Sequence, residues 1–220
     1  MHKLYLISAA PLQLTSIITE SGVEEGHSFV VLESCPFHPR GGGQREDRGW
    51  LDQAAVVDVT HQLDGRVRVY HDGAADFTAG QKVDAVVDEN WRRLQSRLHT
   101  AGHAVAAVAE SMIPGAKAFK AHHWNSESYV MFRCTLAEGT SAIAERLEVQ
   151  LTRDIGAQLA VEVVGDPLAE RRIAIGPYPA VSCGGTHVSN LAELLSVSIR
   201  NVRAKRGEMK IGYDVETGVR

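Results

Sequence analysis

The chain has 220 residues with a formal net charge of −4, and 44% of them are hydrophobic and 23% charged. These proportions are typical of a globular protein, and they exclude a collagen-like repeat, a largely disordered chain and a disulfide-rich scaffold. Three dispersed cysteines (Cys35, Cys134 and Cys183), the lack of a signal-like N-terminus and the lack of any long apolar run lead us to expect a cytoplasmic protein without membrane contact.

The first 87 residues are predicted to form a small β-barrel or sandwich. Asp64 and Gly65 lie between two β-rich runs, and glycine tolerates the positive φ that a tight hairpin turn requires. Several short strands separated by turn signals are typical of such folds. The predicted strands are Lys3–Ser8, Leu14–Glu20, His27–Glu33, Ala54–His61, Arg66–His71 and Gln81–Val87.

The hydrophobic period changes at Asp88. From Trp91 to Met112 apolar residues recur three or four positions apart, which predicts a long helix capped by Asp88 and ended by Pro114. The fold class is therefore expected to be α+β, with a barrel domain at 1–87 and a second domain at 88–220 that holds this helix and an antiparallel sheet. Its other predicted elements are the strand Tyr129–Cys134, the helix Thr140–Leu159, the strand Ala160–Val164 and the hairpin Ser196–Asp214, which turns at Arg206 and Gly207.

Charge is unevenly distributed between the two predicted domains. Residues 1–90 carry 7 Lys/Arg and 14 Asp/Glu, a balance of −7, whereas residues 91–220 carry 16 and 13, a balance of +3. A basic strip near the C-terminal end can contact a phosphate backbone, or it can be the solvated face of a strand. The strip consists of Arg200, Arg203, Lys205, Arg206 and Lys210, with Glu208 as the one acid among them.

Four residues form a candidate metal site. His99 and His103 are four positions apart on the long predicted helix, so their side chains lie on one face and suit a single metal ion. Cys183 and His187 have the same separation, and the glycines between them let both side chains converge. Thiolate and imidazole are the ligands that zinc prefers. The alternative is a histidine pair at the edge of a core, with a core cysteine and a turn histidine.

The type of zinc site stays open at this stage. Four protein ligands indicate a structural site, whereas three ligands and an open position indicate a catalytic one. His187 either binds the metal or stands off it. No glutamate follows His99 directly, which disfavours a zinc peptidase or amidase, because the general base of that motif is missing.

Several segments resemble a known family. HTAGH (99–103) and SCGGTHV (182–188) resemble the HxxxH and CxxxH signatures of the editing domain shared by alanyl- and threonyl-tRNA synthetases. CPFHPRGGGQREDRG (35–49) resembles the FYPxGGGQxxDxG stretch of the alanyl enzymes, with His38 in place of the tyrosine. KAHHWNSESYVMF (120–132) is similar to the segment ending in PYVEF in the freestanding AlaX proteins. We expect the medium-length AlaX form, without a synthetase catalytic module or its ATP-binding fold.

The resemblance implies a trans-editing hydrolase that cleaves the ester at the acceptor end of a mischarged tRNA. The expected substrate is seryl-tRNA(Ala), with glycyl-tRNA(Ala) as a second candidate, and the expected cofactor is Zn²⁺. The alternative is a catalytically inactive, zinc-containing tRNA-binding module of the same fold. Either is expected to be a monomer or a weak homodimer.

The resemblance also implies roles for single residues. Zinc bound by His99, His103 and Cys183 would anchor the substrate or polarise a water, with His187 as fourth ligand or as base. Backbone N–H groups of Gly184, Gly185 and Thr186 are candidate oxyanion donors, and the hydroxyl of Thr100 or Thr186 would contact the serine hydroxyl. The residues expected to contact tRNA are Gly41, Gly42, Gly43, Gln44, His123, Arg200, Arg203, Lys205 and Arg206.

Overall fold

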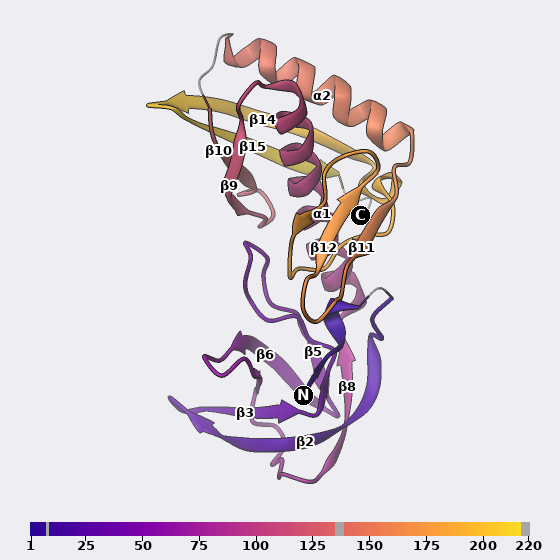
Figure 1. Ribbon diagram of the computed structural model, residues 1–220. Helices are drawn as coiled ribbons and strands as arrows, with labels where there is room; N and C mark the ends of the chain where they lie inside the picture. Colours follow the sequence, from indigo (N-terminus) through magenta and orange to yellow (C-terminus); the bar gives the residue numbers. More distant parts are fainter. Residues whose placement is uncertain (8, 135–138, 217–220) are drawn as a thin grey trace.

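A computed structural model describes residues 1–7, 9–134 and 139–216 of the chain. A β-barrel lies at one end of the molecule, and a helix-backed sheet lies at the other (Figure 1). The barrel is closed, with the strand order β2-β3-β7-β6-β5-β8, so the predicted barrel is confirmed. Its strands are β2 (Gln13–Glu24), β3 (His27–Leu32), β5 (Gly49–Leu51), β6 (Ala54–His61), β7 (Val67–His71) and β8 (Lys82–Val87).

Alternation of side chains builds the barrel core. Successive residues of a strand point to opposite sides of the sheet, so every second residue of a barrel strand faces the interior. In β7, Val67 and Val69 are fully buried, whereas Arg68 between them is only partly buried. Phe37, from the segment after β4 (Ser34–Cys35), is also fully buried in this core.

The predicted first strand is wrong. Only β1 (His2–Lys3) is extended, and it pairs parallel with β4. A short 3-10 turn, η1 (Leu4–Leu6), follows, and it buries Tyr5 against the barrel core. Burial of this one large side chain explains the turn, because a strand would alternate three apolar residues between two faces. Ser8, the last residue of the predicted strand, lies outside the described residues.

The long helix is confirmed as α1 (Glu89–Met112). Its N-cap is Asp88, whose carboxylate accepts a hydrogen bond from Trp91 N at 3.0 Å. Two contacts fix the segment before β5 on the start of α1. The Arg92 guanidinium donates to buried Asp47 at 2.9 Å, and Trp91 Nε1 donates to the Glu46 carbonyl at 2.8 Å. The glycine-rich segment of the barrel domain is thereby held beside the helix that carries His99 and His103.

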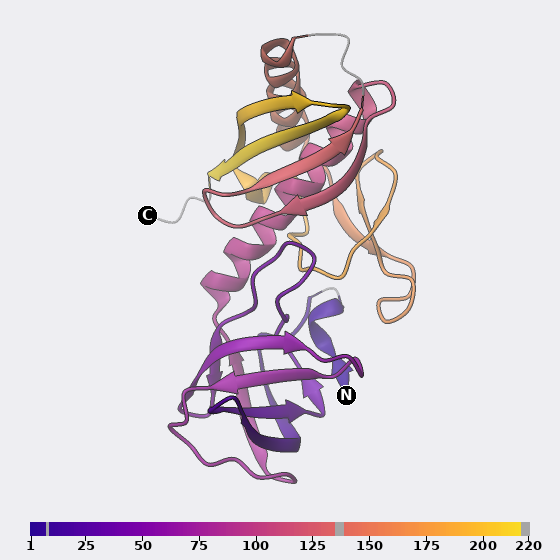
Figure 2. The ribbon, with the colours of Figure 1, turned by 90° about the vertical axis from the view of Figure 1, so that its left-hand side faces the viewer.

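A four-stranded antiparallel sheet packs against α1 and α2, and both helices lie behind it in Figure 2. The helix α2 (Thr140–Gly156) ends three residues before the predicted Leu159, because Gln158 adopts a positive φ of 53°. The predicted hairpin at 196–214 is confirmed. The strand order is β14 (Ser196–Lys205), β15 (Glu208–Glu216), β10 (Tyr129–Arg133) and β9 (Lys117–His122).

A second, smaller sheet flanks α1 on its other side (Figures 1 and 2). It consists of β11 (Val161–Val164), β12 (Arg172–Ile175) and β13 (Val181–Ser182), and the turn η2 (Leu191–Leu194) follows it. Ile173 and Ile175 of β12 pack into the core that α1 and α2 share with the large sheet. Within the described residues, no helix is long and apolar enough to cross a membrane.

Candidate metal centre

Four donor side chains converge between α1 and the loop after β13. His99 and His103 come from successive turns of α1, and Cys183 and His187 come from the loop. One ligand atom from each lies within 4.8 Å of the other three. Within the described part of the chain, this is the one group of His, Cys or acidic side chains so arranged.

The distances fit a tetrahedral ion. Zinc binds nitrogen at about 2.1 Å and sulfur at about 2.3 Å, which places the two donor atoms about 3.6 Å apart at a tetrahedral angle. Cys183 Sγ lies 3.4 Å from His99 Nε2 and 3.3 Å from His187 Nε2. The donor set and its spacing therefore fit the expected zinc.

Gln44 orients His99. Its Oε1 accepts from Thr186 N at 3.0 Å and its Nε2 donates to Thr186 Oγ1 at 2.9 Å, and these two bonds determine which way the amide points. Oε1 also lies 2.7 Å from His99 Nδ1. Because this oxygen can only accept, Nδ1 carries the proton, and the lone pair of His99 Nε2 faces Cys183. This is the arrangement by which metal-binding histidines are usually oriented.

His187 is held in a similar way. Its Nδ1 lies 3.2 Å from Thr100 Oγ1, and its Nε2 faces Cys183. Thr100 Oγ1 also accepts from Val188 N at 3.2 Å, which anchors the loop to α1. Nδ1 of His187 thus contacts a buried hydroxyl, and its Nε2 lies among the donor atoms of the cluster.

Glycine allows the loop and the helix to approach each other. A Cβ on Gly185 would lie 2.1 Å from Cε1 of His99, whereas one on Gly184 would meet nothing within 4 Å. Within α1, a Cβ on Gly102 would lie 2.3 Å from the His123 ring. His123 is consequently buried and stacks on His99, with ring centroids 4.4 Å apart.

Burial dominates the electrostatics of the cluster. It lowers the pKa of His99 and of His187 well below the ordinary value and lowers that of His103 to about 4. The imidazoles are therefore neutral at physiological pH, which is the form that binds metal. Burial also raises the pKa of the Cys183 thiol, so the loss of its proton is coupled to metal binding.

A cavity of about 510 Å³ opens beside the cluster. His103 and His123 are among the residues that line it, and its walls are mostly apolar. They are formed by α1, by β9 at the edge of the large sheet, by β12 and by the segment between β12 and β13. Ligand sites commonly have this size, these apolar walls and a few polar groups at one end. Its wall residues include Ala106, Ala107, Phe119, Ile175, Tyr178 and Val181.

The structure places the other expected residues in different ways. Gly41 and Gly42 are exposed, and the Gly43 carbonyl accepts from His123 N at 2.9 Å, which fastens the glycine loop to the end of β9. Thr186 is buried and accepts from Gln44 and from Ser96 Oγ, the latter at 2.7 Å. The side chain of Gln44, which we expected to contact tRNA, is thus turned inward to the metal centre.

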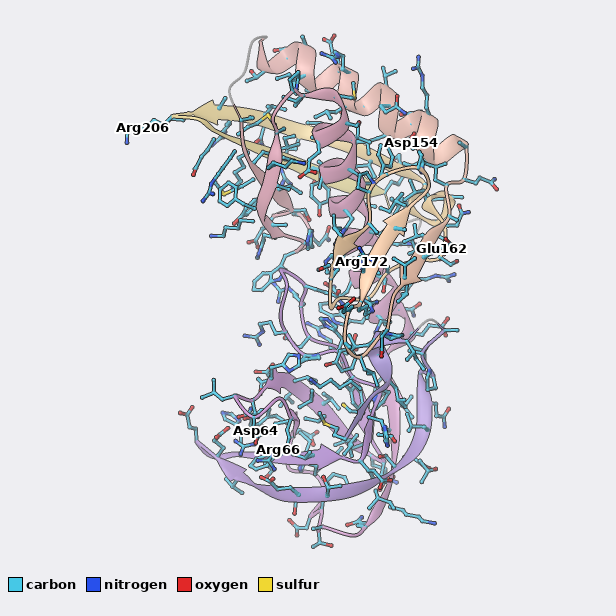
Figure 3. All side chains as sticks on the ribbon, in the orientation of Figure 1. Asp64, Arg66, Asp154, Glu162, Arg172 and Arg206 are labelled. Carbon is cyan, nitrogen blue, oxygen red and sulfur yellow. The ribbon has the colours of Figure 1, made fainter. Side chains whose placement is uncertain are left out.

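The basic strip does not lie at the metal centre. Arg200 donates to the carbonyls of Ser126 and Ser128 and forms an ion pair with Asp214 at 2.7 Å. Arg206 lies at the tip of the β14–β15 hairpin and points away from the molecule (Figure 3). The two remaining expected contacts, Arg203 and Lys205, are exposed on β14.

Sequence reasoning missed Ser96 and Arg171. Ser96 lies one turn before His99 and Thr100 on α1, so the run of polar residues at helical spacing beside the apolar stripe could have indicated it. Arg171 is buried, and its guanidinium donates to the Cys183 carbonyl and, at 2.8 Å, to the Leu6 carbonyl. Because both of its partners are distant backbone groups, no sequence signal could have indicated it.

The chain is similar in sequence to alanine–tRNA ligases. No family model matches the chain. Alanine–tRNA ligases of Streptococcus thermophilus and Synechococcus sp. (strain CC9902) are 26% and 28% identical to it over 87% and 85% of its length, and that of Corynebacterium jeikeium is 25% identical over 90%. The matched regions amount to 25%, 25% and 24% of these relatives, so the chain spans about a quarter of their length. Together with the candidate metal centre, this similarity suggests the alanyl-tRNA synthetase editing-domain family.

Proposed function

We propose that the chain is a zinc-dependent hydrolase that deacylates mischarged tRNA in trans, with seryl-tRNA(Ala) as its substrate and glycyl-tRNA(Ala) as the second candidate. The observation that carries the proposal is that the donor cluster borders a ligand-sized cavity through His103, which is one of the residues lining that cavity. An aminoacyl ester entering this cavity would bring its carbonyl to the cluster, while the attached nucleoside would lie against the apolar walls.

His99, His103 and Cys183 would hold the zinc, with His187 as a fourth ligand or as the base. When bound, zinc acts as a Lewis acid that polarises a carbonyl and lowers the pKa of a bound water. In the hydrolysis, the water oxygen forms a bond to the ester carbon, the bond from that carbon to the ribose oxygen breaks, and the ribose oxygen takes a proton. The partly exposed edge of His103, which lines the cavity, is the side of the cluster that faces the ester.

The backbone and the threonines support this chemistry. Gly185 N already donates to Cys183 Sγ at 3.3 Å, and Thr186 N donates to Gln44, so we assign the oxyanion contact to Gly184 N. The hydroxyl of the substrate's serine would hydrogen-bond to Thr100 or Thr186, in place of one of the groups that now bond to that threonine. Such a contact selects serine over alanine, which has no hydroxyl to offer.

Deacylation of matched substrates tests the proposal. With the zinc-loaded protein, seryl-tRNA(Ala) should be hydrolysed at least about a hundredfold faster than alanyl-tRNA(Ala), and His103→Ala should abolish the reaction. Cys183→Ala should lower the zinc content, whereas Cys35→Ala, in the barrel core, should leave about one zinc per chain. Equal rates on both substrates would refute the editing assignment.

A second function is an inactive tRNA-binding module of the same fold. The observation that favours it is the inward position of all four donors, since four protein ligands are typical of structural zinc. A protein that holds zinc and binds tRNA(Ala) but cleaves neither ester would establish this module in place of the hydrolase.

A further inference from the structure

The large sheet has one face that the helices do not cover. Val130 and Phe132 of β10 and Met209 and Ile211 of β15 point toward α1 and α2 and are buried in the shared core. Strand residues alternate between faces, so the residues between these point the other way. In Figure 2 this open face is turned toward the viewer, with both helices behind the sheet.

Strand register arranges the open face in cross-strand rows. The first row is Lys117, Arg133, Glu208 and Lys205, and the second is Lys120, Met131, Lys210 and Arg203. The third row is His122, Tyr129, Gly212 and Asn201. The three rows thus carry six exposed Lys or Arg side chains against one acid, and one of the six, Lys117, is paired with Glu110 of α1 at 3.6 Å. This concentration of positive charge is local, because the whole chain has a net charge of −4.

Two of these cations stand directly opposite each other. Arg203 and Lys210 are register partners on β14 and β15, and like charges in this position destabilise an antiparallel pair. Among the described residues, no acidic side chain forms an ion pair with either of them. Asp214, on the same strand as Lys210, is paired with Arg200. A bound anion would remove this repulsion, which makes the pair an indicator of an anionic ligand.

Aromatic rings continue the face beyond the cations. The His122 ring contacts that of Trp124 in a tilted arrangement and stacks on that of Tyr129, with centroid distances of 4.6 and 5.6 Å. Arg45 lies 3.8 Å over the Trp124 ring at one end, and Lys210 lies 3.8 Å over the Tyr129 ring at the other. A hollow of about 500 Å³ adjoins these rings, and it is lined by the cations Arg200, Arg203 and Lys210 and by one acid, Glu127. Alternating cations and aromatic rings are typical of surfaces that bind nucleic acids.

We propose that this open face binds RNA, with its unpaired cations contacting phosphates and the rings of Trp124, His122 and Tyr129 contacting an unpaired base. The identification of the RNA as the acceptor arm of tRNA rests on the proposed function. Lys117 and Lys120 border both the open face and the cavity beside the metal centre. An RNA end bound on the face would therefore reach the cavity by crossing the single edge strand β9.

The salt dependence of binding to uncharged tRNA(Ala) tests this interface. The test variant carries Arg203→Gln and Lys210→Gln, and the matched control carries Lys82→Gln on the barrel and Arg153→Gln on α2, both exposed. The binding constant K falls as the salt concentration rises, and each lost phosphate contact makes the negative slope of log K against log salt shallower by about 0.9. Between 50 and 200 mM salt, the test variant should therefore lose about twelvefold less affinity than the wild type. The control should keep the wild-type slope, and all three proteins should hold equal amounts of zinc.

Three results would overturn the proposed RNA interface. An unchanged slope in the test variant, or equal losses in both variants, would overturn the interface. So would binding of the wild type to phosphatidylserine vesicles but not to tRNA, which would indicate a membrane surface. Because uncharged tRNA is the probe, the proposed hydrolase can fail while the interface stands. Conversely, normal deacylation and normal tRNA binding by the test variant would refute only the interface.

Discussion

Replacing Gln44 by leucine tests how the metal centre is held. Gln44 lies in the glycine-rich segment next to the barrel, but its amide oxygen accepts from His99 Nδ1 and from Thr186 N. Leucine has a similar size and accepts nothing, so two buried N–H groups lose their partner. Each unpaired buried donor costs about 1–3 kcal/mol, so the free energy of unfolding should fall by about 2–6 kcal/mol.

The same change should weaken metal binding. Loss of a partner that orients a metal-binding histidine typically reduces metal affinity about 10–100-fold. Chelator competition measures the zinc Kd, and urea unfolding of the metal-free protein measures stability. Gln44→Glu keeps an acceptor oxygen and should recover most of the affinity, whereas Gln53→Leu, at an exposed position, serves as the control.

A zinc Kd for folded Gln44→Leu within about twofold of the wild type, against the usual loss of at least tenfold, would refute this reasoning. It would mean that the His123 ring, stacked 4.4 Å from that of His99, is sufficient to orient the histidine.

Two further predictions follow from the same geometry. Gly185→Ala should lower zinc content, because the new Cβ would lie 2.1 Å from the His99 ring, whereas Gly184→Ala, which has open space around it, should not; equal zinc content would contradict the close approach. Burial lowers the pKa of His38 to about 3, below its unfolded value of about 6.5, so the neutral ring stabilises the fold above pH 6.5 and this stability is lost as the pH falls toward 3. Between pH 6.5 and pH 5, the free energy of unfolding measured in urea should fall by about 2 kcal/mol less in His38→Phe than in the wild type, because the other buried histidines contribute equally to both proteins. An unchanged pH dependence in that variant would contradict the prediction.

The parts of the structure that could be predicted are those encoded by patterns within short segments of the sequence. The three- and four-residue period after Asp88 and the matched spacing of the His and Cys pairs are properties of short segments, so α1 and the donor set followed from them. The domain boundary after residue 87 and the single-residue roles at the site stay predictions. The hydrogen bonds of Gln44 gave no sequence signal, because its partners His99 and Thr186 are 55 and 142 residues away. Strand β9 gave no signal, since as an edge strand it exposes four successive residues, Lys117 to Lys120, and shows no alternation.

The donor cluster also acts on the topology of the chain. Cys183 and His99 are 84 residues apart. A metal bound by both would therefore act as a cross-link that closes a loop containing β9, β10, α2 and the small sheet. Because such a site is not formed in the unfolded chain, the free energy of metal binding adds directly to the stability of the fold. The loop with Cys183 and His187 contains no long helix or strand, so the metal would hold in place a segment that few backbone hydrogen bonds hold. Metal removal should therefore loosen the contact between that loop and α1 before the barrel unfolds, which ties the rigidity of one half of the molecule to metal supply.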